Sequence, residues 1–131
     1  MHASGPFEVK MAPAEGKSAD PAITRFTLDK KYHGDLEGTA SGEMLSAGNP
    51  SSGNAGYVAI EKVTGTLQGR SGSFVLQHSA SIKANVPQMT ITIVPGSGTE
   101  QLEGISGKLT ITFAPGGKHN YDFEYTLPAH L

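Results

Sequence analysis

The stretch SFVLQHSASI, at residues 73–82, has the two-residue period of a β-strand. Side chains two positions apart share one face of a strand, so Phe74, Leu76 and His78 lie on the same side. The opposite face carries three serines, Val75 and Gln77. Because the first face holds the bulkier side chains, we expect it to point into the protein. The stretch therefore predicts a strand that is buried on one face.

The same period recurs along the rest of the chain. Strand-like runs, bounded by Gly, Pro, Asn and Ser, occupy residues 7–11, 22–32, 36–46, 56–68, 73–82, 88–95, 107–114 and 121–127. Most gaps between them are shorter than the dozen residues that a parallel crossover needs. No window of eleven residues free of Gly and Pro has helical spacing. We predict an all-β fold, a single eight-stranded antiparallel β-barrel that occupies residues 1–131 as one domain. Its inside, the lumen, would be lined by apolar side chains such as Met89, Ile91, Ile93, Leu109, Ile111, Phe113, Phe123 and Leu127.

Composition narrows the partners and the environment. The 131 residues carry a formal charge of -2 and no basic run, which excludes nucleic acid as an expected partner. There is no cysteine for a disulfide, and no stretch approaches the roughly 20 apolar residues of a membrane span. We therefore expect a cytoplasmic protein without a membrane partner. Residues 1–5 are expected to be disordered or an expression remnant, and they are left out of the predicted barrel.

Small residues follow one face of the run at residues 36–46. Gly38, Ala40 and Gly42 lie on the same face as Met44. Missing side-chain volume there predicts a cavity for a small ligand, because an eight-stranded barrel is either filled or holds one small molecule. The alternative is that these residues allow the strand to coil strongly. Both explanations remain open at this point.

Glu61 is the carboxylate of greatest interest, since it interrupts the apolar run YVAIEKV at residues 57–63. Glu61 and Lys62 lie on opposite faces of this strand, so one of them points inward. If Glu61 points into the lumen, desolvation raises its pKa and suits it to act as a general base or an electrostatic stabiliser. If it points outward, it is a solvated surface residue.

Other candidates have both a chemical and a structural interpretation. His78 is a possible proton-transfer partner, or a core histidine. The hydroxyls of Tyr57, Tyr121 and Tyr125 are candidates for ligand contact, although tyrosine at a barrel end is usually structural. A metal site is not expected, because the histidines and aspartates lack ligand spacing. A serine hydrolase is not expected either, because no nucleophile elbow is present.

Four segments carry a resemblance to a known family. KYHGDLEG at 31–38, AGYVAIE at 55–61, GSFVLQH at 72–78 and VPGSGT at 94–99 resemble the bacterial DUF3224 family. The resemblance implies a barrel of the allene oxide cyclase type, which is lipocalin-like. Such barrels hold a reactive hydrophobic intermediate by positioning and electrostatics, without a metal or organic cofactor. In the plant cyclases a buried glutamate takes part, and Glu61 and Glu37 are the candidates for that role here.

Three functions remain open from the sequence. The first is a cofactor-independent isomerase or cyclase of a hydrophobic substrate, with Glu61 and His78 as catalytic residues. The second is a non-catalytic carrier or sensor of a hydrophobic metabolite. Under both, the expected ligand contacts are Tyr57, Phe74, Leu76, Gly38, Ala40, Met44, Tyr121 and Tyr125. The third is a filled barrel that acts through its outer surface, where Val58, Ile60 and Val75 would form an apolar patch. This patch favours a homo-oligomer in all three cases.

Overall fold

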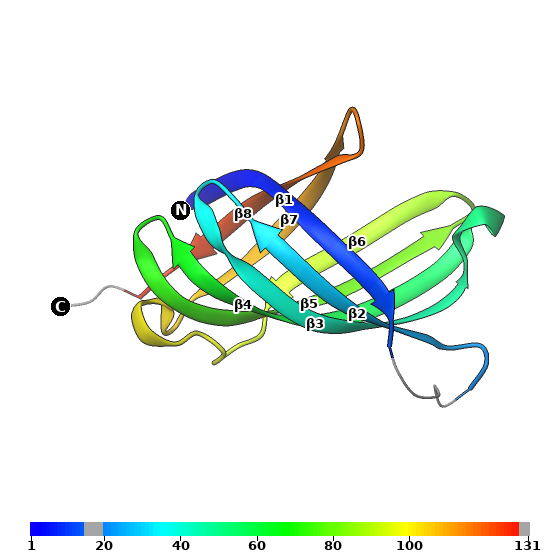
Figure 1. Cartoon of the computed structure of the whole chain (residues 1–131), viewed down its shortest axis with the longest axis horizontal. Helices are drawn as coiled ribbons and strands as arrows, with labels where there is room; N and C mark the ends of the chain where they lie inside the picture. Colours follow the sequence, from blue (N-terminus) through cyan, green and yellow to red (C-terminus); the bar gives the residue numbers. More distant parts are fainter. Residues whose placement is uncertain (15–19, 129–131) are drawn as a thin grey trace.

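The computed structural model describes residues 1–14 and 20–128 and shows a closed barrel of eight strands (Figure 1). The strands are β1 (His2–Pro13), β2 (Thr24–Tyr32), β3 (Leu36–Asn49), β4 (Asn54–Leu67), β5 (Arg70–Lys83), β6 (Val86–Ile93), β7 (Ser106–Ala114) and β8 (Lys118–Thr126). Each strand pairs antiparallel with the next in the chain, and β1 pairs with β8 to close the sheet. The predicted all-β, eight-stranded antiparallel barrel is therefore confirmed.

The main difference from the sequence prediction lies at the N-terminus. Residues 2–5 were expected to stay outside the barrel, but they belong to β1 and pair with β8, from His2 opposite Glu124 to Gly5 opposite Tyr121. Gly5 and Pro6 resemble a loop signal in the sequence. In the barrel, a Cβ at position 5 would lie 2.1 Å from the backbone oxygen of His33, so glycine is needed where two strands come close. This segment closes the barrel.

One seam of the barrel is weakly paired. Strands β6 and β7 share a single ladder pair, Thr92 with Lys108, whereas neighbouring strands elsewhere pair along most of their length. In Figure 1 the β7–β8 hairpin diverges from β6 toward its tip. The connection between the two strands contains the short 3-10 helix η2 (Glu100–Leu102), and the β3–β4 turn contains η1 (Pro50–Ser52). Neither helix in the described part of the chain has the length or apolar character to span a membrane.

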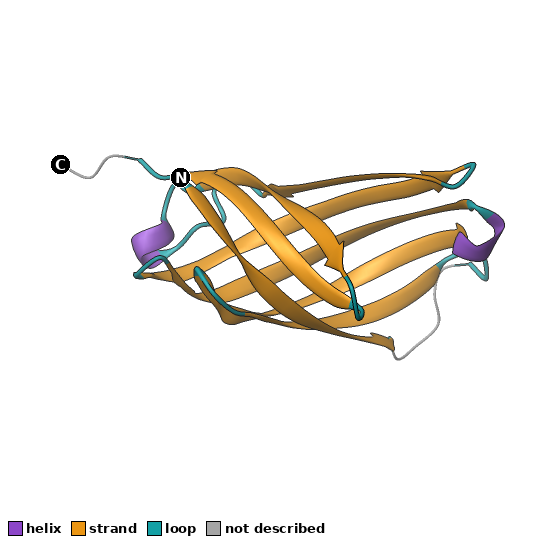
Figure 2. Cartoon of the chain, turned by 90° about the horizontal axis from the view of Figure 1, so that it is seen from above, coloured by secondary structure: helices purple, strands orange, loops and turns teal. Residues whose placement is uncertain are grey.

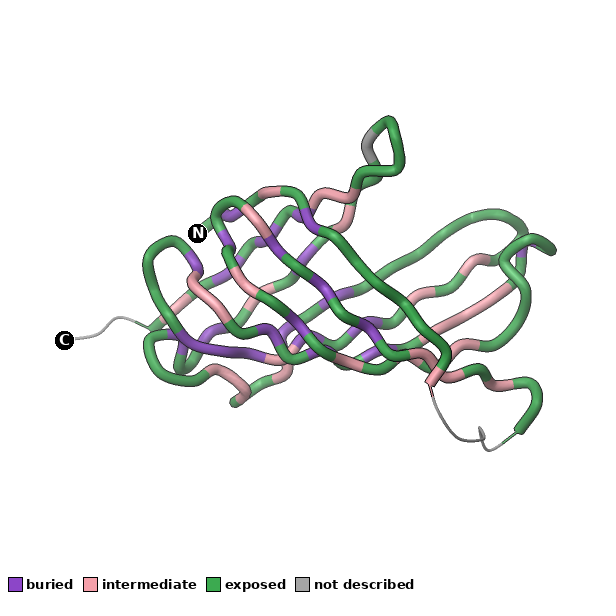
Figure 3. Tube along the Cα trace, viewed as in Figure 1, coloured by how far each residue is buried: buried purple, intermediate pink, exposed green. Residues whose placement is uncertain are grey.

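The two ends of the barrel differ in packing. Figure 2 places η2 at the end that carries the N-terminus and η1 at the opposite end. Buried residues gather toward the η2 end, which we call the closed end (Figure 3). Its core includes Leu36, Leu67, Phe74, Leu102, Phe123 and Tyr125. At the other end, the open end, four apolar residues share the inward-facing parity of their strands yet remain exposed: Val9, Met11, Met89 and Phe113. The lumen is thus filled at one end only.

Candidate functional site

A group of polar side chains, which we call the Glu61 cluster, is buried inside the barrel. The Glu61 carboxylate on β4 is fully buried, and its Oε2 lies 2.7 Å from Nζ of Lys30 on β2, a side chain only 7% exposed. The hydroxyl of Tyr32, also on β2, donates a hydrogen bond to Glu61 Oε1. Nε2 of His78 on β5 lies 3.6 Å from Glu61 Oε2. His78 therefore points inward as predicted, and of the two placements left open for Glu61 the structure shows the inward one.

Small residues on β3 allow this cluster to form. Lys30 and Glu61 lie on strands two apart, whose backbones are separated by about 10 Å at ordinary strand spacing. The intervening strand places Ala40 beside Lys30 and Gly42 beside Glu61. Because neither residue projects a large side chain into the lumen, the ammonium and the carboxylate can meet above β3. The volume that the sequence suggested was free for a ligand is used by this ion pair.

The glycines of β3 also permit a close approach of its backbone to β4. A Cβ on Gly42 would lie 2.1 Å from the backbone oxygen of Ile60, and one on Gly38 would lie 2.5 Å from that of Thr64. Both distances are far inside van der Waals contact, so β3 and β4 can approach this closely only without those side chains. The structure thus favours a backbone-packing role for Gly38 and Gly42 over a cavity for a ligand.

The pKa of Glu61 moves opposite to the direction expected from the sequence. Burial raises the pKa, but the nearby imidazole of His78 and the ammonium of Lys30 outweigh that effect and lower the pKa from 4.5 to about 2. The sequence argument considered burial alone, because it could not show that Lys30 lies against Glu61. Glu61 is therefore a paired carboxylate at neutral pH. Such a group is a weak proton acceptor.

An apolar cavity of about 310 Å³ lies between the Glu61 cluster and the open end. This volume falls at the lower end of the range for small-molecule sites. The apolar lining residues are Phe7, Val9, Met11, Leu28, Met44, Ala59, Met89, Ile111 and Phe113. Four polar residues complete the lining: Lys30, Tyr57, His78 and His119. Side chains from all eight strands therefore contribute to one cavity.

The cavity includes only some of the ligand contacts expected from the sequence. Tyr57 and Met44 line it, and so does His78, which was expected as a catalytic residue. Six expected contacts do not line it: Gly38, Ala40, Phe74, Leu76, Tyr121 and Tyr125. Phe74 and Leu76 are packed into the core.

Two of the predicted tyrosines have structural partners. Tyr121 accepts a hydrogen bond from the Leu36 amide at 2.8 Å and donates one to the His33 backbone oxygen at 2.7 Å. The Tyr125 hydroxyl donates to the side chain of Gln68. These hydroxyls hold the β2–β3 and β4–β5 turns at the closed end.

Sequence reasoning missed two members of the Glu61 cluster, Lys30 and Tyr32. A signal was present, because both share the face of Leu28 in the strand at residues 24–32. A lysine at an inward position between two apolar residues indicates a buried charge that needs a partner. Across residues 1–14 and 20–128, no three His, Asp or Glu side chains gather where they could hold a metal ion.

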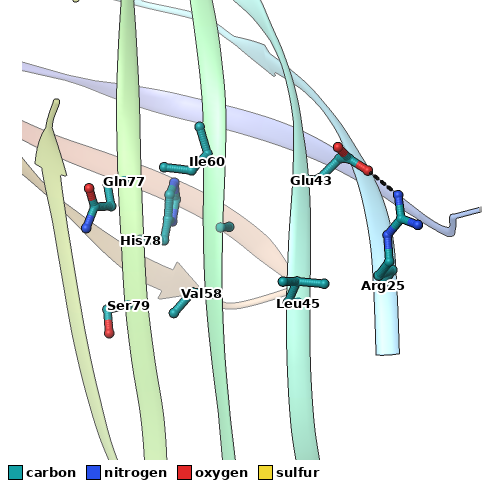
Figure 4. A pocket seen from close by; sticks show the side chains of 9 residues that line it. Arg25, Glu43, Leu45, Val58, Ile60, Gln77, His78 and Ser79 are labelled. Carbon is teal, nitrogen blue, oxygen red and sulfur yellow. Dashed lines mark hydrogen bonds and ion pairs between the residues drawn. The ribbon is translucent and has the colours of Figure 1, made fainter. Parts of the chain in front are cut away.

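A second, larger hollow lies on the outer surface and not in the lumen. This groove of about 530 Å³ is lined mainly by outward-facing side chains of β2 to β5, among them Leu45, Val58 and Ile60, and it also borders the inward-facing Ala59 and His78 (Figure 4). Val58 is 51% exposed and Ile60 is 49% exposed, as the sequence predicted for an outer face. An ion pair between Arg25 and Glu43, with 2.9 Å between Nη2 and Oε1, borders the groove. The third predicted member, Val75, is half-buried beneath the segment 94–99.

The fold and the site together define a class of protein, a closed antiparallel β-barrel with an apolar cavity at one end above a buried ionic cluster. The chain belongs to the DUF3224 family, described as "Protein of unknown function (DUF3224)", whose sequence profile matches residues 3–125. It is similar to a crystal structure of a protein with unknown function from this family, from Shewanella oneidensis MR-1. The two are 38% identical, with a TM-score of 0.90 over 99% of this chain and 98% of that one. Among curated proteins no match is found. The resemblance to DUF3224 is confirmed, while the likeness to allene oxide cyclases stays a prediction.

Proposed function

We propose that the protein binds a small hydrophobic molecule at the open end of its barrel and carries or senses it without changing it chemically. The observation that supports this proposal is the cavity of about 310 Å³ lined mainly by apolar side chains from all eight strands. Such a concave apolar site with a few polar groups is the usual form of a small-molecule site. Burial of exposed Met11, Met89 and Phe113 by a ligand would provide the favourable free energy of binding.

The state of Glu61 favours binding over base catalysis. Its pKa is about 2, Oε1 accepts from Tyr32, and Oε2 is paired with Lys30. Glu61 is also absent from the cavity lining, so a ligand in the cavity does not touch it. A general base needs both contact with the substrate proton and a pKa near the working pH. Glu61 has neither property.

The four methionines of the chain offer a direct test. Met11, Met44 and Met89 line the cavity, whereas Met1 lies at the closed end and donates through its amino group to the Tyr125 backbone oxygen. In protein labelled with ¹³C at the methionine methyl groups, a bound hydrophobic probe such as 2-octanone should shift the three cavity resonances and leave Met1 in place. Shifts of equal size at all four methyl groups, or at none, would overturn the proposal.

Catalysis by His78 is the second candidate function. It is favoured by the position of His78, which lines the cavity and lies 3.6 Å from a carboxylate that would orient its ring. Such a pair could move a proton within a bound substrate, as an isomerase or cyclase requires. Mass spectrometry of denatured protein separates the candidates. A carrier releases its co-purified ligand unchanged after incubation, whereas an enzyme releases a product that disappears in the His78→Phe variant.

A further inference from the structure

The polar groups that line the cavity are all able to donate hydrogen bonds. Lys30, Tyr57, His78 and His119 are the four, and no carboxylate is among the lining residues. Burial, and then the negative charge of Glu61, raise the pKa of Tyr57, so its hydroxyl keeps its proton at neutral pH. Lysine can only donate, while the neutral imidazole and the phenol can do either. The cavity therefore offers donors to a ligand.

Two of these donors have unused capacity. The Lys30 ammonium carries three N–H groups, but in the described part of the chain its only polar contact is Glu61 Oε2, with the Phe7 ring 5.4 Å away on another side. His78 is 97% buried, and its Nε2 has no hydrogen-bond partner among the described residues. Buried polar groups are normally paired. The nearest acceptor, Glu61 Oε2, lies 3.6 Å from Nε2, so His78 keeps the capacity for a hydrogen bond to a ligand in the adjacent cavity.

The charge of the Glu61 cluster limits what that ligand can be. Lys30 and Glu61 form an ion pair inside the barrel, so their charges cancel. An anionic head group would place a second negative charge near Glu61 in a region of low dielectric. A cationic head group would be repelled by the ammonium of Lys30. A neutral acceptor satisfies the free donors and leaves the charge balance unchanged.

We infer that the cavity takes a ligand with an apolar body and a neutral carbonyl head, as in a ketone, ester or lactone, whose oxygen accepts hydrogen bonds from Lys30 and His78. The inference rests on the proposed binding function and names its ligand class. The carbonyl lies on the floor formed by the Glu61 cluster. The hydrocarbon body extends between Met44 on β3, Met89 on β6 and Ile111 on β7 toward the open end.

Three probes of equal length test the head group. They are 2-octanone, its methylene isostere 2-methyl-1-octene, and octanoate, each titrated into methyl-labelled protein at pH 8. Hydrogen bonds to a charged donor correspond to roughly tenfold to a hundredfold in affinity, so 2-octanone should bind tighter than the alkene by that factor. Octanoate should bind more weakly than 2-octanone.

Each outcome of this titration decides one claim. Equal affinity of ketone and alkene would overturn the carbonyl inference and leave the proposed binding function intact. Binding of octanoate as tight as that of 2-octanone would overturn the neutral head. Failure of all three probes to shift the cavity methionines would refute the inference and the binding function together.

Variants identify the donors. The paired substitution Lys30→Met with Glu61→Gln removes both charges, so no ion is left buried without a partner. It should remove most of the difference in affinity between 2-octanone and the alkene. The alkene should still bind, which shows that the variant is folded. Gln77→Ala, on the outward face next to His78, is the matched control and should change neither affinity. An advantage that survives in the paired variant would show that Lys30 is not the donor.

An infrared measurement gives an independent result. The carbonyl stretch of 2-octanone bound to the wild-type protein should lie at lower wavenumber than in hexane, because hydrogen bonding weakens the C=O bond. In His78→Phe, which keeps a ring of similar size, the stretch should return part of the way. A band at the hexane position in the wild-type protein would overturn the inference, whether or not the paired variant folds.

Discussion

Replacement of Glu61 by glutamine would leave the charge of Lys30 inside the barrel without a counter-charge. The carboxylate and the ammonium are 2.7 Å apart, and their side chains are 0% and 7% exposed. Removal of one partner of a buried ion pair costs about 3–5 kcal/mol, because the remaining ion has lost both water and its partner. We expect Glu61→Gln to lower the free energy of unfolding by that amount, measured by urea denaturation followed by circular dichroism.

The paired variant Lys30→Met with Glu61→Gln tests the cause of this loss. Both charges are then gone, and methionine has an unbranched stem that can occupy the space of the lysine stem. We expect the paired variant to be more stable than Glu61→Gln alone. The two substitutions should therefore be non-additive by more than 1 kcal/mol, as is typical of residues in direct contact.

The ion pair of Arg25 and Glu43 supplies a matched control on the outside of the same region. Its atoms are 2.9 Å apart, but the side chains are 37% and 62% exposed. Exposed pairs contribute about 0–1 kcal/mol, so Glu43→Gln should change the free energy of unfolding by no more than that. A loss in Glu61→Gln as small as that in Glu43→Gln, or strict additivity in the paired variant, would refute the reasoning.

Three further predictions concern pH, dynamics and assembly. Folding lowers the pKa of Glu61 from 4.5 to about 2, so its ionised form stabilises the folded protein fully above pH 4.5 and loses that effect as the pH falls toward 2. The free energy of unfolding should therefore fall by about 3 kcal/mol over this range. This decrease should be absent in Glu61→Gln. In hydrogen exchange, the amides at residues 86–91 of β6 that face β7 should exchange faster than the amides of β4, because β4 is paired on both sides. Equal protection of the two strands would contradict the weak pairing between β6 and β7. The exposed apolar residues Val58 and Ile60 predict a homodimer at micromolar concentration in light scattering, and Val58→Asp should yield monomer; a wild-type monomer would disprove this.

Most of the barrel could be predicted from alternation within single strands. The strand at residues 73–82 lies within β5, with Phe74, Leu76 and His78 buried as its period indicates. Segments 36–46 and 107–114 likewise lie within β3 and β7. The prediction failed at residues 2–5. Gly5 and Pro6 are typical of a loop, but this segment forms a strand because it pairs with β8. Pairing between the chain ends leaves no local signal.

The candidate site was less predictable than the fold. His78, Tyr57 and Met44 were found from the alternation of side chains along a strand, which identified Glu61 only as one of two residues that could point inward. Parity could not distinguish the filled end of the barrel from the open one. Leu76 was therefore predicted at the site although it is packed into the core.

The sequence by itself determined the class of fold, the positions of most strands and the inward face of most of them, because these depend on side-chain period and turn residues a few positions apart. Only the tertiary structure decided the state of Glu61. Lys30 lies far from Glu61 in the chain, and the two meet because Ala40 and Gly42 leave room above β3. Closure of the barrel also decided which end is filled and which keeps a cavity. The free space at each end depends on side chains from all eight strands, and these face one another only after the barrel has closed.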